Sequence, residues 1–179
     1  MHLIKKIIIV CYLFVISCEL HEGIFDNPLD LEAAEAKGIY PPALVFFPNN
    51  AVVTIQDTVE VEVYAMMIEN VGMAQIEVHY EANKLSVESV IQGSLFQGDN
   101  QPFFITENDS NNGILTIFIT YLGPNGKAIE GTGDIALIRF KPRSMGFTEF
   151  RISQESILLD PDANAITLNG YGKGIIDAR

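Results

Sequence analysis

Short carboxylate and amide side chains that could bind a metal ion gather near the C-terminal end of the chain. Asp160, Asp162 and Asn164 alternate with single residues, which is the spacing of the first half of a calcium-binding loop. Ala165 stands where the sharp turn of such a loop needs glycine, and Tyr171 stands where a bidentate glutamate would close it. The same residue types form turns whose side chains hydrogen-bond to their own backbone. The sequence therefore favours a turn over a metal site and indicates no cofactor.

Side chains suited to acid–base catalysis do not form a recognisable constellation. His79 is the only histidine of the predicted folded domain, and it lies two residues from Glu77, on the same face of a predicted strand. We interpret it as a solvated strand histidine, and carboxylates are too numerous to single out a glycosidase pair. The glycines of Gly170-x-Gly172-x-Gly174 lack the strand-to-helix context of a phosphate loop and indicate a turn. The chain is therefore predicted not to be an enzyme.

The remaining candidate for chemistry is a cysteine near the N-terminus. Residues 5–18, KKIIIVCYLFVISC, carry two lysines and then an apolar run, as in a secretory signal. The run is shorter than the ~20 residues that span a bilayer. Its end resembles the lipobox of bacterial lipoproteins, in which the cysteine takes a diacylglycerol and the chain is cut just before it. We expect residues 1–17 to be a signal peptide and Cys18 the lipid attachment site. The alternative is an ordinary cleaved signal or a short anchor helix.

The charge of the chain limits the classes of partner. After removal of the signal peptide, the mature protein is expected to be an exported, membrane-anchored lipoprotein at the cell surface or the periplasmic face. Its net charge of −12 becomes −14 once Lys5 and Lys6 leave with the signal. So acidic a surface argues against nucleic acid and anionic lipid, which leaves membrane contact to the lipid on Cys18. A protein partner or a polysaccharide fits better. Because Cys11 leaves with the signal, no thiol remains for a disulfide.

The elements that must position these residues are predominantly strands. Residues 18–42 are predicted to be a tether that follows the lipidated cysteine. Within it, Asp30 to Lys37 can form two helical turns, with Asp30 as the N-cap and Gly38 as the stop. From Ala43 onward the apolar residues recur with a period of two, and turn sequences separate the runs. This predicts one all-β domain over residues 43–179, an antiparallel sandwich of about nine strands.

Three stretches in order resemble the cohesin family. Residues 71–87 are similar to an apolar strand that runs into Tyr-Asp-Pro-x-x-Leu, and residues 131–141 are similar to the family's glycine-led strand G-x-G-x-(apolar)-A-x-(apolar)-x-F. Residues 158–166, followed by 174–176, are similar to its closing hairpin. The resemblance covers Ala43 to Asp177 and implies a nine-stranded jelly-roll sandwich. It also implies a role in holding a dockerin-bearing enzyme, commonly one that degrades polysaccharide.

The chain departs from the family pattern at one turn and on the strand before it. Glu81-Ala82 stands where the family usually has Asp-Pro. Met73 and Gln75 stand where well-known cohesins place the Asn and Asp that help to grip dockerin. These departures bear on recognition of a standard dockerin and not on the fold.

Alternation assigns the side chains of two strands to opposite faces. In residues 73–80 and 114–121 every second side chain points inward, namely Ala74, Ile76, Val78 and Tyr80 in the first and Leu115, Ile117, Ile119 and Tyr121 in the second. If the cohesin pairing holds, the outward members share one open sheet face: Gln75, Glu77, His79, Thr116, Phe118 and Thr120. Phe118 would stand there among polar neighbours, where an aromatic side chain can anchor a partner, unless a loop or the tether covers it.

The sequence therefore predicts a non-catalytic, membrane-anchored extracytoplasmic module that engages a partner protein through this face. A carbohydrate-binding module and a structural envelope lipoprotein are the alternatives. The chain has no Trp and its six Tyr are scattered, which favours a protein over a glycan as the ligand of the face.

Overall fold

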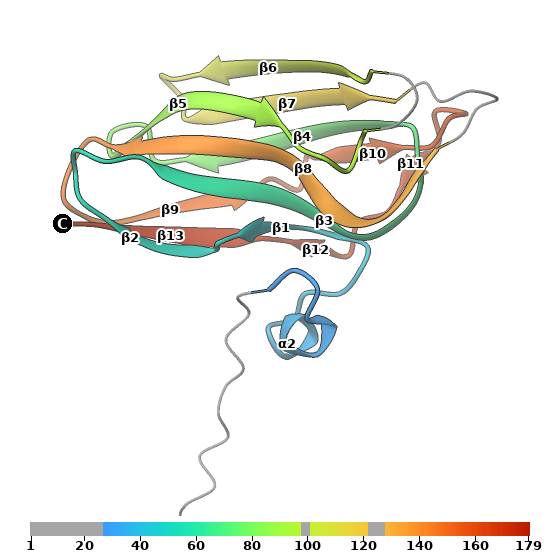
Figure 1. Ribbon diagram of the computed structural model, residues 1–179, viewed down its shortest axis with the longest axis horizontal. Helices are drawn as coiled ribbons and strands as arrows, with labels where there is room; N and C mark the ends of the chain where they lie inside the picture. Colours follow the sequence, from blue (N-terminus) through green and yellow to red (C-terminus); the bar gives the residue numbers. More distant parts are fainter. Residues whose placement is uncertain (1–26, 98–100, 122–127) are drawn as a thin grey trace, which may run out of the picture.

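The computed structural model describes residues 27–97, 101–121 and 128–179, and it is a sandwich of two β-sheets with one short helix beneath them (Figure 1). The predicted signal peptide and Cys18 lie outside the described residues. Among the described residues, no helix has the length and apolar character needed to cross a membrane. The elements in chain order are α2 (Leu31–Ala36), β1 (Ala43–Phe47), β2 (Asn50–Val53), β3 (Val59–Val71), β4 (Met73–Tyr80), β5 (Leu85–Gln92), β6 (Phe103–Asp109), β7 (Ile114–Thr120), β8 (Ile129–Pro142), β9 (Gly146–Ile152), β10 (Ile157–Leu159), β11 (Ala165–Ile166), β12 (Gly170–Tyr171) and β13 (Lys173–Ala178).

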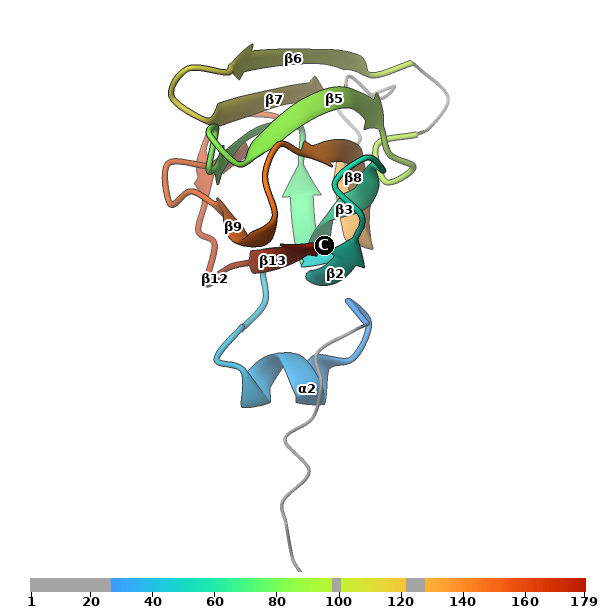
Figure 2. The ribbon, with the colours of Figure 1, turned by 90° about the vertical axis from the view of Figure 1, so that its left-hand side faces the viewer.

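The two sheets confirm the predicted all-β sandwich. One sheet has the order β12-β1-β3-β8-β5, and the other has the order β11-β10-β4-β9-β13-β2. The second sheet is extended by β7, which pairs with β4, and by β6, which pairs with β7. The described residues hold thirteen strand segments, more than the nine expected, and several of them are only two to four residues long. Figure 2 shows the two layers from one end.

Two pairs at the sheet edges are parallel, whereas the other pairs are antiparallel. β1 pairs with β12, and β2 pairs with β13, in parallel. Pro48 lies between β1 and β2 and cannot donate to a ladder, so the chain leaves one sheet there and enters the other. One N-terminal stretch thereby contributes a strand to each sheet, β1 beside the edge strand β12 and β2 as the edge strand of the other sheet.

The core between the sheets is predominantly apolar and is connected by aromatic rings. Phe150 of β9 packs against Phe46 of β1 at a centroid distance of 4.6 Å and against Phe140 of β8 at 5.3 Å. Phe140 in turn packs against Tyr80 of β4 at 5.9 Å. These four rings alternate between the two sheets and are all buried. Such ring pairs add about 0.5–1.5 kcal/mol each beyond their buried area.

The glycines near the C-terminus serve close packing rather than the single turn that the sequence indicated. Gly170 belongs to β12 and Gly174 to β13, with Gly172 at the corner between them. A Cβ atom on Gly172 would lie 2.7 Å from Cα of Val45, and one on Gly174 would lie 2.1 Å from Cζ of Phe150. The glycines therefore let β12 and β13 approach β1 and the central ring.

The short helix forms where the sequence predicted it and lies against the sandwich. The Asp30 carboxylate caps it by accepting a hydrogen bond from the backbone N–H of Ala33 at 2.9 Å. Gly38 follows with φ +73°, the left-handed conformation that favours glycine after a helix. Ala34 is fully buried in a small cluster with Val45 of β1 and Met66 of β3. This part of the predicted tether is therefore docked on the outer side of the β1–β3 sheet (Figure 2).

Replacing Gly174 by alanine tests the contact with the central ring. The new methyl group would overlap the ring of Phe150, so we expect Gly174→Ala to lower the free energy of unfolding by about 1–3 kcal/mol. Urea denaturation followed by circular dichroism measures the change. Phe150→Leu in the same chain removes the overlapping ring edge, so the double variant should lose less than the sum of the two single losses. Additive losses would contradict the proposed packing.

Candidate partner-binding face

The six side chains expected on an open sheet face lie on one face of β4 and β7. Gln75 is directly opposite Phe118, and Glu77 is directly opposite Thr116. His79 is the next outward residue along β4, and Thr120 is the next outward residue along β7. All six side chains are partly exposed. Their inward neighbours on both strands are buried, as the alternation predicted. We call this outer surface of β6, β7, β4, β9 and β10 the partner face.

One half of the partner face is apolar. Register places Ile105 of β6 beside Phe118, and Ile157 of β10 beside Gln75, so one row crosses four strands. The next row towards the strand ends brings Phe103 of β6 and Met73 of β4 to either side of Thr120. Phe103 is 64% exposed, Ile105 and Ile157 are each 45% exposed, and Met73 is 42% exposed. The apolar band is the set Met73, Phe103, Ile105, Phe118 and Ile157, and a contiguous exposed set of this kind marks an interaction surface.

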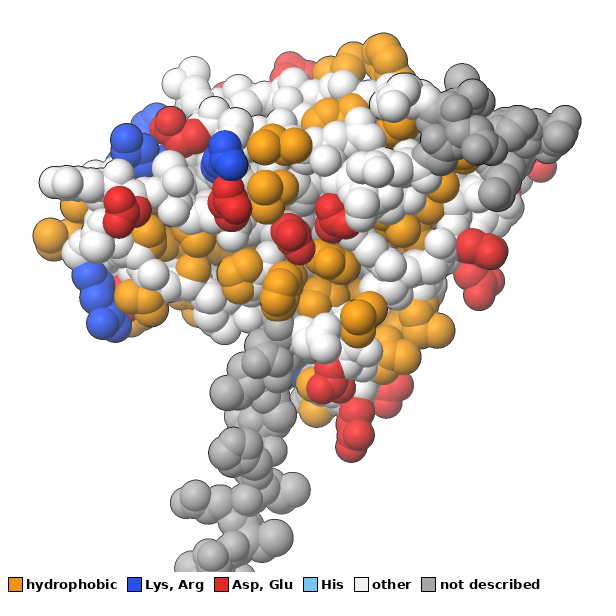
Figure 3. All heavy atoms as spheres, viewed as in Figure 1, with side chains coloured by type: hydrophobic (Ala, Val, Ile, Leu, Met, Phe, Trp, Pro, Cys, Tyr) orange, Lys and Arg blue, Asp and Glu red, His pale blue; other side chains and the backbone are white. Residues whose placement is uncertain are grey.

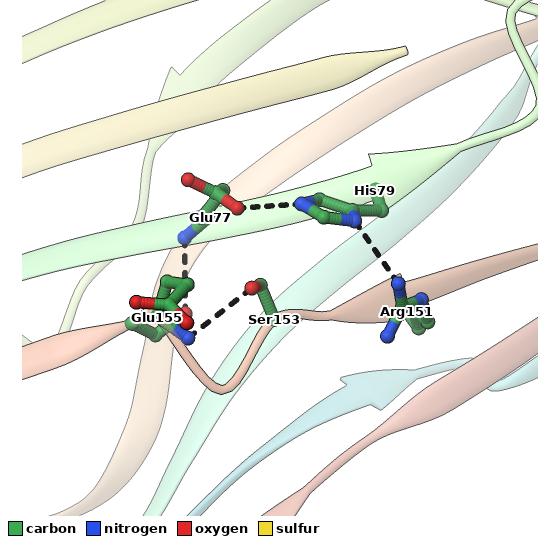
Figure 4. Close-up of polar contacts among 6 residues, drawn as sticks. Glu77, His79, Arg151, Ser153 and Glu155 are labelled. Carbon is green, nitrogen blue, oxygen red and sulfur yellow. Dashed lines mark hydrogen bonds and ion pairs between the residues drawn. The ribbon is translucent and has the colours of Figure 1, made fainter. Parts of the chain in front are cut away.

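The other half of the partner face carries a chain of polar contacts. Nε2 of His79 lies 2.5 Å from Oε1 of Glu77, and Nη2 of Arg151 on β9 lies 3.2 Å from Nδ1 of His79 (Figure 4). Arginine can only donate, so Nδ1 accepts and Nε2 carries the hydrogen that is donated to the carboxylate. The imidazole therefore connects the Arg151 guanidinium to the Glu77 carboxylate across β9 and β4.

The strand that carries Glu77 and His79 is held in place by backbone and side-chain contacts. The backbone N–H of Glu77 donates to Oγ of Ser156 at 3.0 Å, and its carbonyl accepts from the backbone N–H of Ser153 at 2.8 Å. At the end of the strand, the hydroxyl of Tyr80 donates to Oδ1 of Asn108 on β6 at 2.7 Å. Burial raises the pKa of the Tyr80 phenol, so the hydroxyl stays a donor at neutral pH. The hydrogen bond ties β6 to β4 across β7.

Four residues of the partner face were not anticipated from the sequence. Phe103 and Ile105 belong to β6, which begins with three apolar residues in succession, so the sequence does not show which of them point outward. Ile157 and Arg151 come to the face through pairing with Gln75 and His79 of β4, at sequence separations of 82 and 72 residues. No local pattern indicates such pairings.

The candidate metal-binding side chains form a turn that is closed by its own hydrogen bonds. Oδ1 of Asp160 accepts from the backbone N–H groups of Asp162 at 2.9 Å and Asn164 at 2.8 Å. The side-chain amide of Asn164 donates to Oδ2 of Asp160 at 3.0 Å. These bonds, led by the one from the Asn164 side chain, hold the pKa of Asp160 below its usual value. Among the described residues, no group of three or more His, Cys, Asp or Glu side chains is placed to hold a metal ion.

Comparison with known proteins gives one family and one fold. A family model described as "Cohesin domain" matches residues 48–171. None of the curated proteins matches the chain. A solved non-cellulosomal cohesin from the hyperthermophilic archaeon Archaeoglobus fulgidus is 20% identical with a TM-score of 0.62, over 76% of this chain and 90% of that chain. A type II cohesin domain from the cellulosome of Acetivibrio cellulolyticus is 16% identical with a TM-score of 0.63, over 75% and 92%.

A third similar structure contains a partner. It is a type I cohesin–dockerin complex from Clostridium thermocellum, 15% identical with a TM-score of 0.61, over 76% of this chain and 95% of that chain. At these identities the likeness establishes the sandwich fold.

The Asp160 turn predicts a pH-dependent stability difference. A carboxyl whose pKa is lowered by folding stabilises the protein above its unfolded pKa, near 3.9, and that contribution is lost as pH falls through the folded pKa. We therefore expect Asp160→Ala to lower the melting temperature at pH 7, with the gap to the unsubstituted chain closing towards pH 3. Thermal melts across that range measure it, and Asp162→Ala is the matched control. A rise in melting temperature with calcium that Asp160→Ala abolishes would contradict the turn and indicate a metal site.

Proposed function

Because the chain belongs to the cohesin domain family, we propose that it is a non-catalytic binding module that engages a dockerin-bearing partner protein through the partner face. The observation that carries this proposal is the apolar band, which lies exposed on the sheet formed by β6, β7 and β4. The similar Clostridium thermocellum structure, a complex of a cohesin with a dockerin, supports the class of partner.

The two halves of the partner face have different energetic roles. Burying the exposed parts of the apolar band contributes a few kcal/mol, at about 25 cal/mol per Å² of apolar area. Association itself costs about 4–15 kcal/mol in lost translational and rotational freedom. The band alone is therefore too small for tight binding, and the polar half must contribute as well. Arg151 retains guanidinium donors beyond the one that contacts His79, and these can bind a carboxylate of the partner.

The chemistry of the face specifies the complementary surface of the partner. Met73 belongs to the apolar band and Gln75 lies between Phe118 and Ile157, at the places where the family pattern has polar gripping residues. A matching partner presents apolar side chains to these rows. At the opposite end of the strands, it presents a carboxylate to Arg151 and a hydrogen-bond donor to Glu77. Recognition proceeds through surface complementarity, and no bond is made or broken.

The proposed cellular setting is an exported chain held at a membrane by a lipid on Cys18. The lipobox-like sequence supports this setting. The helix α2 lies on one side of the sandwich, and β6 lies on the opposite side (Figure 1). A chain anchored before α2 therefore directs the edge formed by β6 away from the membrane.

A charge placed in the apolar band should abolish partner binding. Ile105→Asp puts a carboxylate that must be desolvated into the centre of the contact, so we expect at least a tenfold loss of affinity, about 1.4 kcal/mol. The immobilised chain is incubated with secreted proteins of the source cells, and mass spectrometry counts the dockerin-bearing proteins retained.

Ile91→Asp is the matched control for this experiment. Ile91 lies on β5 of the other sheet and has the same exposed fraction as Ile105, 45%. Capture of dockerin-bearing proteins that survives Ile105→Asp but not Ile91→Asp would place the contact on the sheet that contains β5, which would contradict the proposed partner face. Capture of none by the unsubstituted chain would refute the proposed partner class.

Replacing Cys18 tests the anchor separately. Cys18→Ser removes the thiol that takes the lipid, so we expect the protein to move from the membrane fraction to the soluble exported fraction and to lose label from radioactive palmitate. Cell fractionation with immunoblotting measures the first change, and autoradiography of the immunoprecipitated protein measures the second. Palmitate labelling that persists in Cys18→Ser would overturn the lipid assignment without affecting the partner face.

A further inference from the structure

A hollow of about 910 Å³ opens beside the C-terminal end of α2, at the corner where the chain turns from β12 into β13. Its walls come from the end of the helix, the turn between β1 and β2, the end of β9, and the segment from Asn169 to Lys173. This volume lies within the range of small-molecule sites, about 300–1,000 Å³. The hollow is separate from the apolar band, and Arg151 borders both surfaces.

Like charges lie side by side in the wall of this hollow. Lys173 of β13 lies directly opposite Arg151 of β9 in the antiparallel ladder, and Lys37 lines the hollow from the end of the helix. Among the described residues that line it, every charged side chain is basic, although the chain has a net charge of −12. Figure 3 shows the contrast on another face, where acidic side chains spread over the sandwich and the helix. Directly opposed like charges destabilise a strand pair, and an anion bound between them would remove that repulsion.

Neutral polar side chains complete the walls. Asn50, Gln154 and Asn169 contribute amides, and Tyr171 contributes a half-buried phenol. Asn169 is fixed, since its Nδ2 donates to the carbonyl of Pro41 at 2.8 Å. The side chains of Gln154 and Tyr171, like that of Lys173, form no hydrogen bond or ion pair with another residue of the described ranges. Amides donate and accept at once, which is what a sugar hydroxyl requires, and the Tyr171 hydroxyl can do the same.

We propose that this hollow binds a short acidic oligosaccharide, whose carboxylates contact Lys173 and Arg151 and whose hydroxyls contact the amide side chains. The proposal goes beyond partner binding and does not depend on it. A phosphate or a phospholipid headgroup would use the basic side chains and leave the amides and Tyr171 without a role. A neutral glycan would leave the opposed charges uncompensated. A ligand that carries both carboxylates and hydroxyls uses the whole wall.

Calorimetric titration of the full chain tests the proposal, with Cys18→Ser in every sample so that no lipid interferes. The probes are tetragalacturonate, cellotetraose, inorganic phosphate and phosphatidylglycerol vesicles. We expect saturable binding of one tetragalacturonate per chain and no detectable binding of cellotetraose. Lys173→Gln should weaken tetragalacturonate binding about fivefold, the effect of losing one partly exposed ion pair. Lys141→Gln, at an exposed lysine on β8 of the other sheet, should leave it unchanged.

Any of the following binding results would overturn the proposal. Thermal melts first establish that Lys173→Gln is folded. Absence of tetragalacturonate binding, or binding that Lys173→Gln leaves intact, removes the assigned site. Equal affinity for cellotetraose indicates a neutral glycan site, and tighter binding of phosphate or of vesicles indicates a phosphate or headgroup site.

Discussion

The packing of Phe150 between the two sheets is the contact on which both proposed surfaces depend. Its ring contacts Phe46 and Phe140 of the opposite sheet and lies over Gly174, whose missing side chain leaves the space that the ring fills. Because successive strand residues point to opposite faces, fixing Phe150 inward fixes Arg151 outward. Among the described residues, the interior is held by packing without a disulfide. This packing sets the register of β9 and thereby places the Arg151 guanidinium beside both His79 and the hollow.

Register also explains how ordinary strand sequences make a face with two chemical halves. The apolar members of β6, β7 and β10 come together at one end of β4, while Glu77, His79 and Arg151 come together at the other end. A slip of one residue in the β4–β7 pairing would turn Phe118 inward and remove it from the apolar band. The hydrogen bond from Tyr80 to Asn108 spans three strands and opposes such a slip. The same contacts that stabilise the sheet therefore define what it can bind.

Local alternation was enough to predict the fold class and the orientation of two site strands. Residues 73–80 and 114–121 have the period of two, and the structure places their side chains as that period requires. The capped helix after Asp30 was equally predictable from the sequence, since the residues that begin and end it lie within one short segment. The pairing of Ile157 with Gln75, by contrast, joins segments about eighty residues apart. Tertiary contacts stabilise this pairing, and no local sequence pattern indicates them. Gly174 was misread for the same reason, because the ring that requires it lies on another strand.

The hollow illustrates why net charge is a poor guide to a particular surface. A net charge of −12 describes the field far from the molecule, where the contributions of separate groups merge. Near the surface, screening confines each charge to about 10 Å at 0.1 M ionic strength, so three basic side chains can govern a site within an acidic protein. Lys37, Arg151 and Lys173 are far apart in sequence and meet only because β12 and β13 turn beside the docked helix. Since Arg151 also borders the partner face, an acidic sugar and a partner carboxylate would draw on the same guanidinium, which couples the two proposed surfaces through a single residue.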